Sequence, residues 1–126
     1  MVAADLNNLG TLESARDHYA AAEQYLRDSL AIQQRLGRTS QVETLMTLAN
    51  LAAVYSHQKR LDEADRTYIR LVSFLDEDKT INEPVLAASL LHYADRLHDR
   101  QDSAEAERLR ARAMQMQVRS AVRRGA

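Results

Sequence analysis

The stretch LANLAAVYSHQKRLDEADRTY, residues 48–68, decides the fold. Its apolar residues recur three and four positions apart on both sides of a polar segment, which is the spacing of two helices that each bury one face. Ala52 lies before the polar segment and Ala64 after it, and such small residues let antiparallel helices approach closely where they cross. The stretch therefore predicts a helical hairpin, with helices over about 40–57 and 60–76.

The same pattern occurs three times along the chain, at a spacing of 42 residues and without a gap. Large apolar residues return at this spacing, and so do the small residues at the expected crossings. The matching columns are Leu6, Leu48 and Leu90; Leu9, Leu51 and Tyr93; Gly10, Ala52 and Ala94; and Ala22, Ala64 and Ala106. A supersecondary unit repeated at a fixed period indicates stacked repeats that bury a continuous core. We therefore predict an all-α fold of three antiparallel helix–turn–helix repeats with six helices.

Helical spacing places the other helices near 2–15, 18–36, 83–99 and 102–122. Their boundaries have local signals, because glycine ends helices, short polar residues cap them and proline suits a first turn. The residues expected in these roles are Gly37, Thr39 or Ser40 with Glu43, Asn82 before Pro84, and Asp102 with Glu105.

Composition agrees with one globular domain. The chain has 126 residues, a formal net charge of −1, 45% hydrophobic and 28% charged residues, and no cysteine. These values exclude a disordered chain, a disulfide framework and a thiolate metal site. No apolar run approaches the roughly 18 residues of a membrane span, and the start lacks the features of a signal peptide. We expect a cytoplasmic protein without a membrane partner.

Two runs of residues carry a family resemblance. Leu6-Asn7-Asn8-Leu9-Gly10, followed by Tyr19, Ala22, Glu23 and Leu30, resembles the tetratricopeptide repeat, and residues 48–68 resemble it most. The period of 42 is similar to the kinesin-light-chain type of this repeat. The resemblance covers nearly the whole chain and implies a right-handed superhelix, with 1–126 as a single domain and repeats over about 1–37, 40–78 and 82–122. The third repeat departs most, with Ser103 and Arg110 at positions that hold large apolar residues in the other two.

In this family the first helices of the repeats line a concave groove that holds an extended peptide or a partner helix. Carried over by column, the resemblance implies a peptide-binding groove. Its residues are Asn7, Asn8, Thr11 and Ser14 in the first repeat; Ala49, Asn50, Ala53 and His57 in the second; and Leu91, His92, Asp95 and His98 in the third. Asparagine can donate to and accept from a peptide backbone. The alternative is that these residues are merely solvated, or that the asparagine column caps neighbouring helices.

Several site classes find no support in these columns. No lysine or arginine occurs in the columns that hold such cations in carboxylate-gripping members of the family, so nothing would offset the desolvation of a bound carboxylate. His92, Asp95 and Asp99 share about one helix face and could bind a divalent metal, but His92 occupies the asparagine column and no metalloprotease motif is present. We expect no metal, and polar groove residues that make binding pH-sensitive. Phosphate loops and nucleophile elbows are also missing, so we expect no cofactor and no enzyme.

The C-terminal helix is rich in arginine and has no acid from Arg108 onward. Its arginines are Arg108, Arg110, Arg112, Arg119, Arg123 and Arg124. They can favour the helix macrodipole, pair with Asp76-Glu77-Asp78 of a neighbouring molecule, or contact nucleic acid; we favour the first, since nucleic-acid contact would call for interleaved aromatics. The same helix carries an apolar strip that predicts docking of another repeat or a dimer contact. The strip is Met114, Met116, Val118 and Val122.

Together these observations predict a non-catalytic scaffold that binds a protein or peptide partner in its groove. The alternatives are a self-assembly module, a homodimer through the terminal helices, and a regulatory or sensor module of a larger protein. A nucleic-acid-contacting role ranks last.

Overall fold

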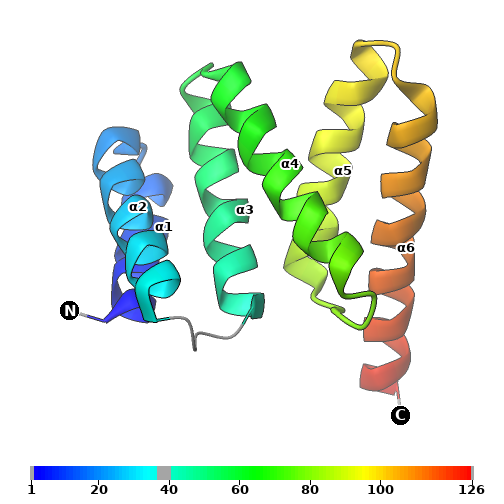
Figure 1. Ribbon diagram of the computed structural model, residues 1–126, viewed down its shortest axis with the longest axis horizontal. Helices are drawn as coiled ribbons and strands as arrows, with labels where there is room; N and C mark the ends of the chain where they lie inside the picture. The colour runs from blue at the N-terminus through cyan, green and yellow to red at the C-terminus, as the bar shows by residue number, and fades with distance from the viewer. Residues whose placement is uncertain (1, 37–40, 126) are drawn as a thin grey trace. The chain divides into compact units, whose positions relative to one another are not determined.

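The computed structural model describes residues 2–36 and 41–125, and these residues form six helices and no strand (Figure 1). The predicted all-α class is therefore confirmed. Each observed helix begins and ends within a few residues of its predicted bounds. The helices are α1 (Ala3–Ala15), α2 (Tyr19–Leu36), α3 (Gln41–His57), α4 (Leu61–Glu77), α5 (Pro84–Asp99) and α6 (Ser103–Gly125). Among the described residues, no helix is long and apolar enough to cross a bilayer.

The predicted helix-boundary residues are confirmed only in part. Gly37, Thr39 and Ser40 lie outside the described residues. Pro84 opens α5 as predicted, but the cap at Asn82 is wrong, because Glu83 holds the N-cap position with φ −119° and ψ 120° and no side-chain cap bond. A residue before proline is forced into extended backbone, which is the N-cap conformation, so Pro84 itself selects Glu83.

The helices group into two compact units, Met1–Leu71 and Val72–Ala126, which divide within α4. The first unit holds α1, α2, α3 and the start of α4, and the second holds the rest of α4 with α5 and α6. A single domain over 1–126 stays a prediction.

In the first unit α1 and α2 form a hairpin, and α3 packs against both. Leu26, Leu45 and Leu48 are fully buried between these helices. Gly10 lies where α1 crosses α2, and a Cβ atom added there would come within 2.7 Å of Leu26 Cγ and 3.3 Å of the Ala22 carbonyl oxygen. The small-residue column therefore corresponds to a close helix approach in this hairpin.

The three turns between paired helices repeat the 42-residue period in their backbone. Asp17, Lys59 and Gln101 all adopt the left-handed conformation, with φ of 62°, 62° and 67°. The backbone N–H of the next residue donates to the carbonyl oxygen five residues before it. These bonds are 2.8 Å long for His18, 2.9 Å for Arg60 and 2.9 Å for Asp102. This pattern is the Schellman helix end, which usually places glycine at the left-handed residue. Because none of the three is glycine, the sequence carried no signal for this turn.

In the second unit α5 and α6 pack as a hairpin around Leu86, Leu90 and Leu109. Met116 is buried in this core at 1% exposure, so its assignment to the exposed apolar strip is wrong. The residues of the strip that remain exposed are Met114, Val118 and Val122. They recur four residues apart and so share one face of α6.

Several arginines of α6 bind within their own chain. Arg108 pairs with Asp76 at 2.9 Å, and Arg112 donates to the carbonyl oxygens of Asp78 and Ile81 at 3.2 and 3.3 Å. Arg123 donates to the Asn82 carbonyl oxygen at 3.2 Å. The favoured macrodipole explanation does not account for these bonds, and the acidic turn expected to pair with a neighbouring molecule is occupied from the same unit. A planar guanidinium can serve several carbonyls at once, which suits it to tie the α4–α5 loop to α6.

Candidate functional site

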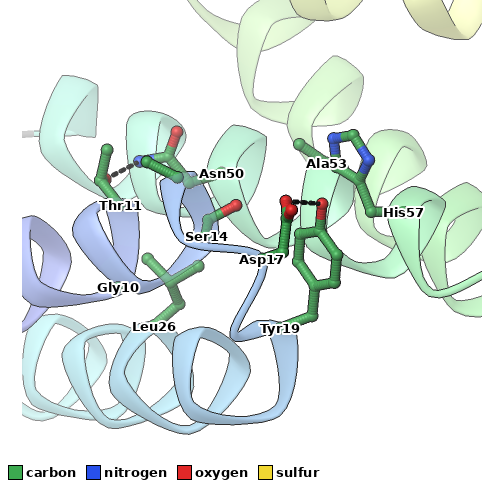
Figure 2. Close-up of a pocket in the computed structure, with 10 residues that line it drawn as sticks. Gly10, Thr11, Ser14, Asp17, Tyr19, Leu26, Asn50, Ala53 and His57 are labelled. Atoms are coloured by element: carbon green, nitrogen blue, oxygen red, sulfur yellow. Dashed lines mark hydrogen bonds between the residues drawn. The ribbon is translucent and has the colours of Figure 1, made fainter.

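A hollow of about 400 Å³ opens between α1 and α3 in the first unit (Figure 2). Five of the residues predicted for the groove line it, which are Thr11, Ser14, Asn50, Ala53 and His57. The other lining residues are Gly10, Ala15, Asp17, Tyr19 and Leu26. The hollow therefore combines the last turns of α1 and α3 with the turn that leads into α2.

One end of the hollow is built around Asn50. Its amide nitrogen Nδ2 donates to Asn7 Oδ1 at 3.2 Å and to Thr11 Oγ1 at 3.4 Å, which joins α3 to α1. Asn50 thus neither caps a helix nor stands merely solvated, the two alternatives to a binding role. Both bonds use the amide nitrogen, so the carbonyl oxygen Oδ1 of Asn50 can still accept a hydrogen bond from a guest.

The other end is built around two stacked rings. The Tyr19 and His57 rings lie 5.1 Å apart between centroids, with planes inclined by 6°. The Tyr19 hydroxyl donates to Asp17 Oδ1 at 2.8 Å (Figure 2). This bond to a carboxylate is the main cause that raises the pKa of Tyr19 above its ordinary value, because it stabilises the protonated phenol.

The turn between α1 and α2 holds Asp17 and Tyr19 in these positions. The Asp17 N–H donates to the Ser14 carbonyl oxygen at 3.0 Å and the His18 N–H to the Glu13 carbonyl oxygen at 2.8 Å. A contact of 2.8 Å between His18 Nδ1 and Glu13 Oε2 adds a second tie across the same turn. The backbone therefore places the Asp17 carboxylate beside the hollow before any partner is bound.

Sequence reasoning missed Asp17 and Tyr19 as lining residues. Tyr19 was identified only as a repeat position, where the second and third repeats hold Leu61 and Ser103. The one sequence signal for a role of Tyr19 was that only the first repeat has an aromatic residue at this position. It could not show that the ring meets His57 from the next repeat, because that contact depends on how α3 packs against α1 and α2.

Other predicted groove residues lie elsewhere. Ala49 is 5% exposed, so it offers almost no surface to a partner, because it lies on the side of α3 that packs into the core. Asn8 lines a separate shallow hollow of about 460 Å³ with Asp5, Leu9 and Leu12. Asn8 and Asn50 share a repeat column but differ in their surroundings. Asn50 bonds to the first helix of the preceding repeat, through Asn7, whereas Asn8 faces the second hollow.

The four predicted residues of the third repeat belong to the second unit. His92, Asp95 and His98 are exposed on α5, and Leu91 is half-buried. Asp95 Oδ1 accepts a hydrogen bond from Arg110 at 3.0 Å. Among the described residues, no three histidine or acidic side chains come together as a metal site. Whether these four residues extend the groove stays a prediction.

The charge of the hollow follows from its lining. Asp17 is the only acid among the ten lining residues, and none of them is a lysine or arginine. A bound carboxylate would therefore find no cation in this lining to offset its desolvation.

The hydrogen bonds of Ser14, Asp17 and His57 can be compared with those of a catalytic relay. Asp17 is hydrogen-bonded to Tyr19, and the His57 ring is stacked on the same tyrosine. A relay would need the acid bonded to the histidine and the histidine to the serine. The described hydrogen bonds of these three residues include neither contact.

Comparison with known families supports this fold. A family model described as the tetratricopeptide repeat matches residues 1–77, which span α1 to α4. The match does not distinguish the kinesin-light-chain type, which stays a prediction. No curated protein shows significant similarity to the chain.

Proposed function

The chain belongs to the tetratricopeptide-repeat family, and from that premise we propose that its first unit binds an extended peptide segment of a partner protein in the hollow between α1 and α3. Repeats of this family are protein-interaction scaffolds and are typically non-catalytic. The observation that carries the proposal is the hollow itself, which is open, lined by both polar and apolar groups, and built mainly on the first helices of two successive repeats.

The lining suits a peptide for chemical reasons. An extended backbone presents N–H and C=O groups that lose water on binding and need partners. Asn50 Oδ1 can accept and the Ser14 hydroxyl can both donate and accept, so these groups can satisfy a backbone without regard to its sequence. Leu26, Ala53 and the two stacked rings supply apolar surface for a side chain. A volume of about 400 Å³ is at the smaller end of ligand sites.

The test is selection of peptides from a random display library on the folded chain. The selected peptides are then measured against a double variant, Asn50→Ala with His57→Ala, and against a control, Gln115→Ala with Gln117→Ala. Both control residues are exposed on α6. We expect the first variant to lose binding and the control to keep it.

Circular dichroism must show that both variants keep their helicity, because Asn50→Ala removes the bond between α1 and α3. Peptides that bind the double variant as well as they bind the unchanged chain would refute this site. Binding that also fails in the α6 control would point to another surface.

A second candidate is self-assembly through α6. Met114, Val118 and Val122 are 65%, 56% and 65% exposed and share one helix face. This exposed apolar face is the only observation behind the candidate, which therefore ranks second. Light scattering over a concentration series tests it: association that Val118→Glu abolishes would support self-assembly, and a constant monomer mass would dismiss it.

The remaining candidates gain no supporting contact. Arg108, Arg112 and Arg123 are engaged within their own unit, which reduces the positive surface that nucleic acid would need. No described residue favours a sensor role over simple scaffolding.

A further inference from the structure

The hollow carries one formal charge, and it is negative. With histidine neutral, Asp17 is the only charged residue among the ten that line it. The Tyr19 hydroxyl occupies Asp17 Oδ1, which leaves the other carboxylate oxygen able to accept from a guest. A carboxylate held beside a partly enclosed site attracts a cation and disfavours an anion.

The helix ends around the hollow add partial charges of the same sign. Ala15 is the last residue of α1 and His57 the last of α3, so two helix C-termini end here. Tyr19, the first residue of α2, also lies in the lining, whereas Leu61, the first residue of α4, does not. A helix C-terminus carries a negative partial charge, so the ends at Ala15 and His57 act in the same direction as the Asp17 carboxylate.

The rings beside Asp17 narrow the kind of cation. Tyr19 bonds Asp17 through its hydroxyl and stacks on His57 through its ring, so a carboxylate and an aromatic surface lie next to each other (Figure 2). A guanidinium is planar, stacks on aromatic rings and presents a fork of N–H donors to a carboxylate. An ammonium is a compact point charge, so it can pair with the carboxylate but lacks the flat surface that stacks on a ring. The apolar walls at Leu26 and Ala53 can cover the methylene stem of a long side chain.

We propose that the hollow receives an arginine side chain of the bound segment, with its guanidinium paired to Asp17 and lying against the Tyr19 and His57 rings. This rests on the proposed function, because it names the side chain that the peptide site selects. A partner segment that contains arginine is therefore preferred over one of the same length without it.

The experiment uses two small probes and the full chain labelled with ¹⁵N. One probe is N-acetyl-arginine N-methylamide, and the other is the matching citrulline compound, which keeps the shape and loses the charge. Amide shifts are followed by NMR during titration. We expect saturable shifts at Ser14, Asp17 and Ala53 with the arginine probe. The citrulline probe should bind at least about tenfold more weakly, since hydrogen bonds to charged groups are roughly twice as strong as neutral ones.

Two variants separate charge from shape. Asp17→Asn keeps the size of the side chain and tolerates the left-handed backbone, so it removes the charge alone. It should weaken the arginine probe about tenfold and leave citrulline unchanged. Tyr19→Leu installs the residue that the second repeat has at this column and should weaken the arginine probe several-fold by removing the ring. The matched control is Asp62→Asn, an exposed acid on α4 outside the lining.

The results that overturn the inference are specific. They are equal binding of the two probes, arginine binding that Asp17→Asn leaves unchanged, or no saturable shift at the hollow up to the solubility limit of the arginine probe. The proposed function is tested separately by the library peptides. Peptides that need Asn50 and His57 but are not enriched in arginine would leave the peptide site standing and refute only the arginine preference.

Discussion

Replacing Gly10 with alanine tests the close crossing of α1 and α2 quantitatively. Two effects oppose each other. Alanine is favoured over glycine inside a helix by about 1 kcal/mol, which would stabilise α1. Against this, the new Cβ would lie 2.7 Å from Leu26 Cγ and 2.8 Å from Leu26 Cδ2, and Leu26 is fully buried. Overpacking of this kind costs about 1–3 kcal/mol.

The close atom decides which effect prevails. Leu26 Cγ is the branch carbon of its side chain rather than a flexible end, so relief requires the whole side chain or the α2 backbone to move. We therefore expect Gly10→Ala to lower the free energy of unfolding by about 1 kcal/mol in net terms. The same change in a Leu26→Ala background should instead raise it, by up to about 1 kcal/mol, because both Leu26 atoms are gone and only the 3.3 Å contact with the Ala22 carbonyl oxygen opposes the helix propensity of alanine.

The assay is a double-mutant cycle by urea unfolding, followed by far-UV circular dichroism. Leu26→Ala alone costs about 2–5 kcal/mol, so all four proteins are measured with the same added osmolyte to keep them folded. Ala52→Gly, in the same repeat column, is the control for propensity and should cost about 1–2 kcal/mol. A stabilising Gly10→Ala effect of equal size in both backgrounds would refute the packing argument.

Three further predictions concern the turns and the charged contacts. Lys59→Gly should raise the free energy of unfolding by about 1 kcal/mol in urea, because glycine has no steric penalty at φ 62°, whereas Lys59→Ala should change it little. Arg112→Lys should lower it by about 1–3 kcal/mol, since one ammonium cannot replace the fork that serves the loop carbonyls, and Arg119→Lys should stay within about 0.5 kcal/mol. The Arg60 side chain lowers the pKa of Glu63 mainly by hydrogen bonding, so an NMR titration of Arg60→Gln should show that pKa higher. A carboxyl group whose pKa is lower in the folded state stabilises the fold at pH values above its unfolded pKa. This stabilisation is lost as the pH falls through the folded pKa, so acidification should destabilise the unchanged chain more than it destabilises Arg60→Gln.

The helices and their order could be predicted from the sequence because both depend on local and periodic features. Apolar residues such as Leu48 and Leu90 fall at one helical spacing and one repeat period, and the buried residues of the structure follow that period. Small residues at a crossing are likewise a local choice with a direct packing consequence, as Gly10 shows. These signals agree with one another, which is the condition under which sequence patterns predict a fold well.

Contacts that join separate elements could not be predicted in the same way. Arg112 reaches carbonyls more than thirty residues away, and no pattern along the chain shows which loop it will meet. Met116 was assigned to a surface strip because its neighbours on the helix are apolar, whereas the rotation of α6 against α5 buries it. Turn conformation was hidden for another reason: Lys59 and Gln101 adopt a backbone that glycine usually marks.

Part of the lining of the candidate site could be predicted from the sequence. The residues Thr11, Ser14, Asn50 and His57 follow from the repeat columns, whereas Asp17 and Tyr19 do not. Asp17 gives the hollow its charge and Tyr19 supplies the ring that stacks on His57, and both occupy columns where the other repeats hold unrelated residue types.

This division has a physical basis. A repeat position that packs in the core constrains its residue type in every copy, as the column of Ala22, Ala64 and Ala106 does, because any larger side chain would separate the helices. A position at the rim of a hollow has no such constraint and is free to differ between copies. His57 stands in a column with Ala15 and Asp99, and only in the second repeat can a ring there stack on Tyr19. The periodic columns therefore build the scaffold, and the columns that break the period are where the selectivity of this chain for a partner should be sought. Exchanging His57 for the alanine of its column should accordingly weaken peptide binding, with little change in unfolding free energy because the side chain is exposed. A large loss of stability with unchanged binding would assign His57 to the scaffold instead.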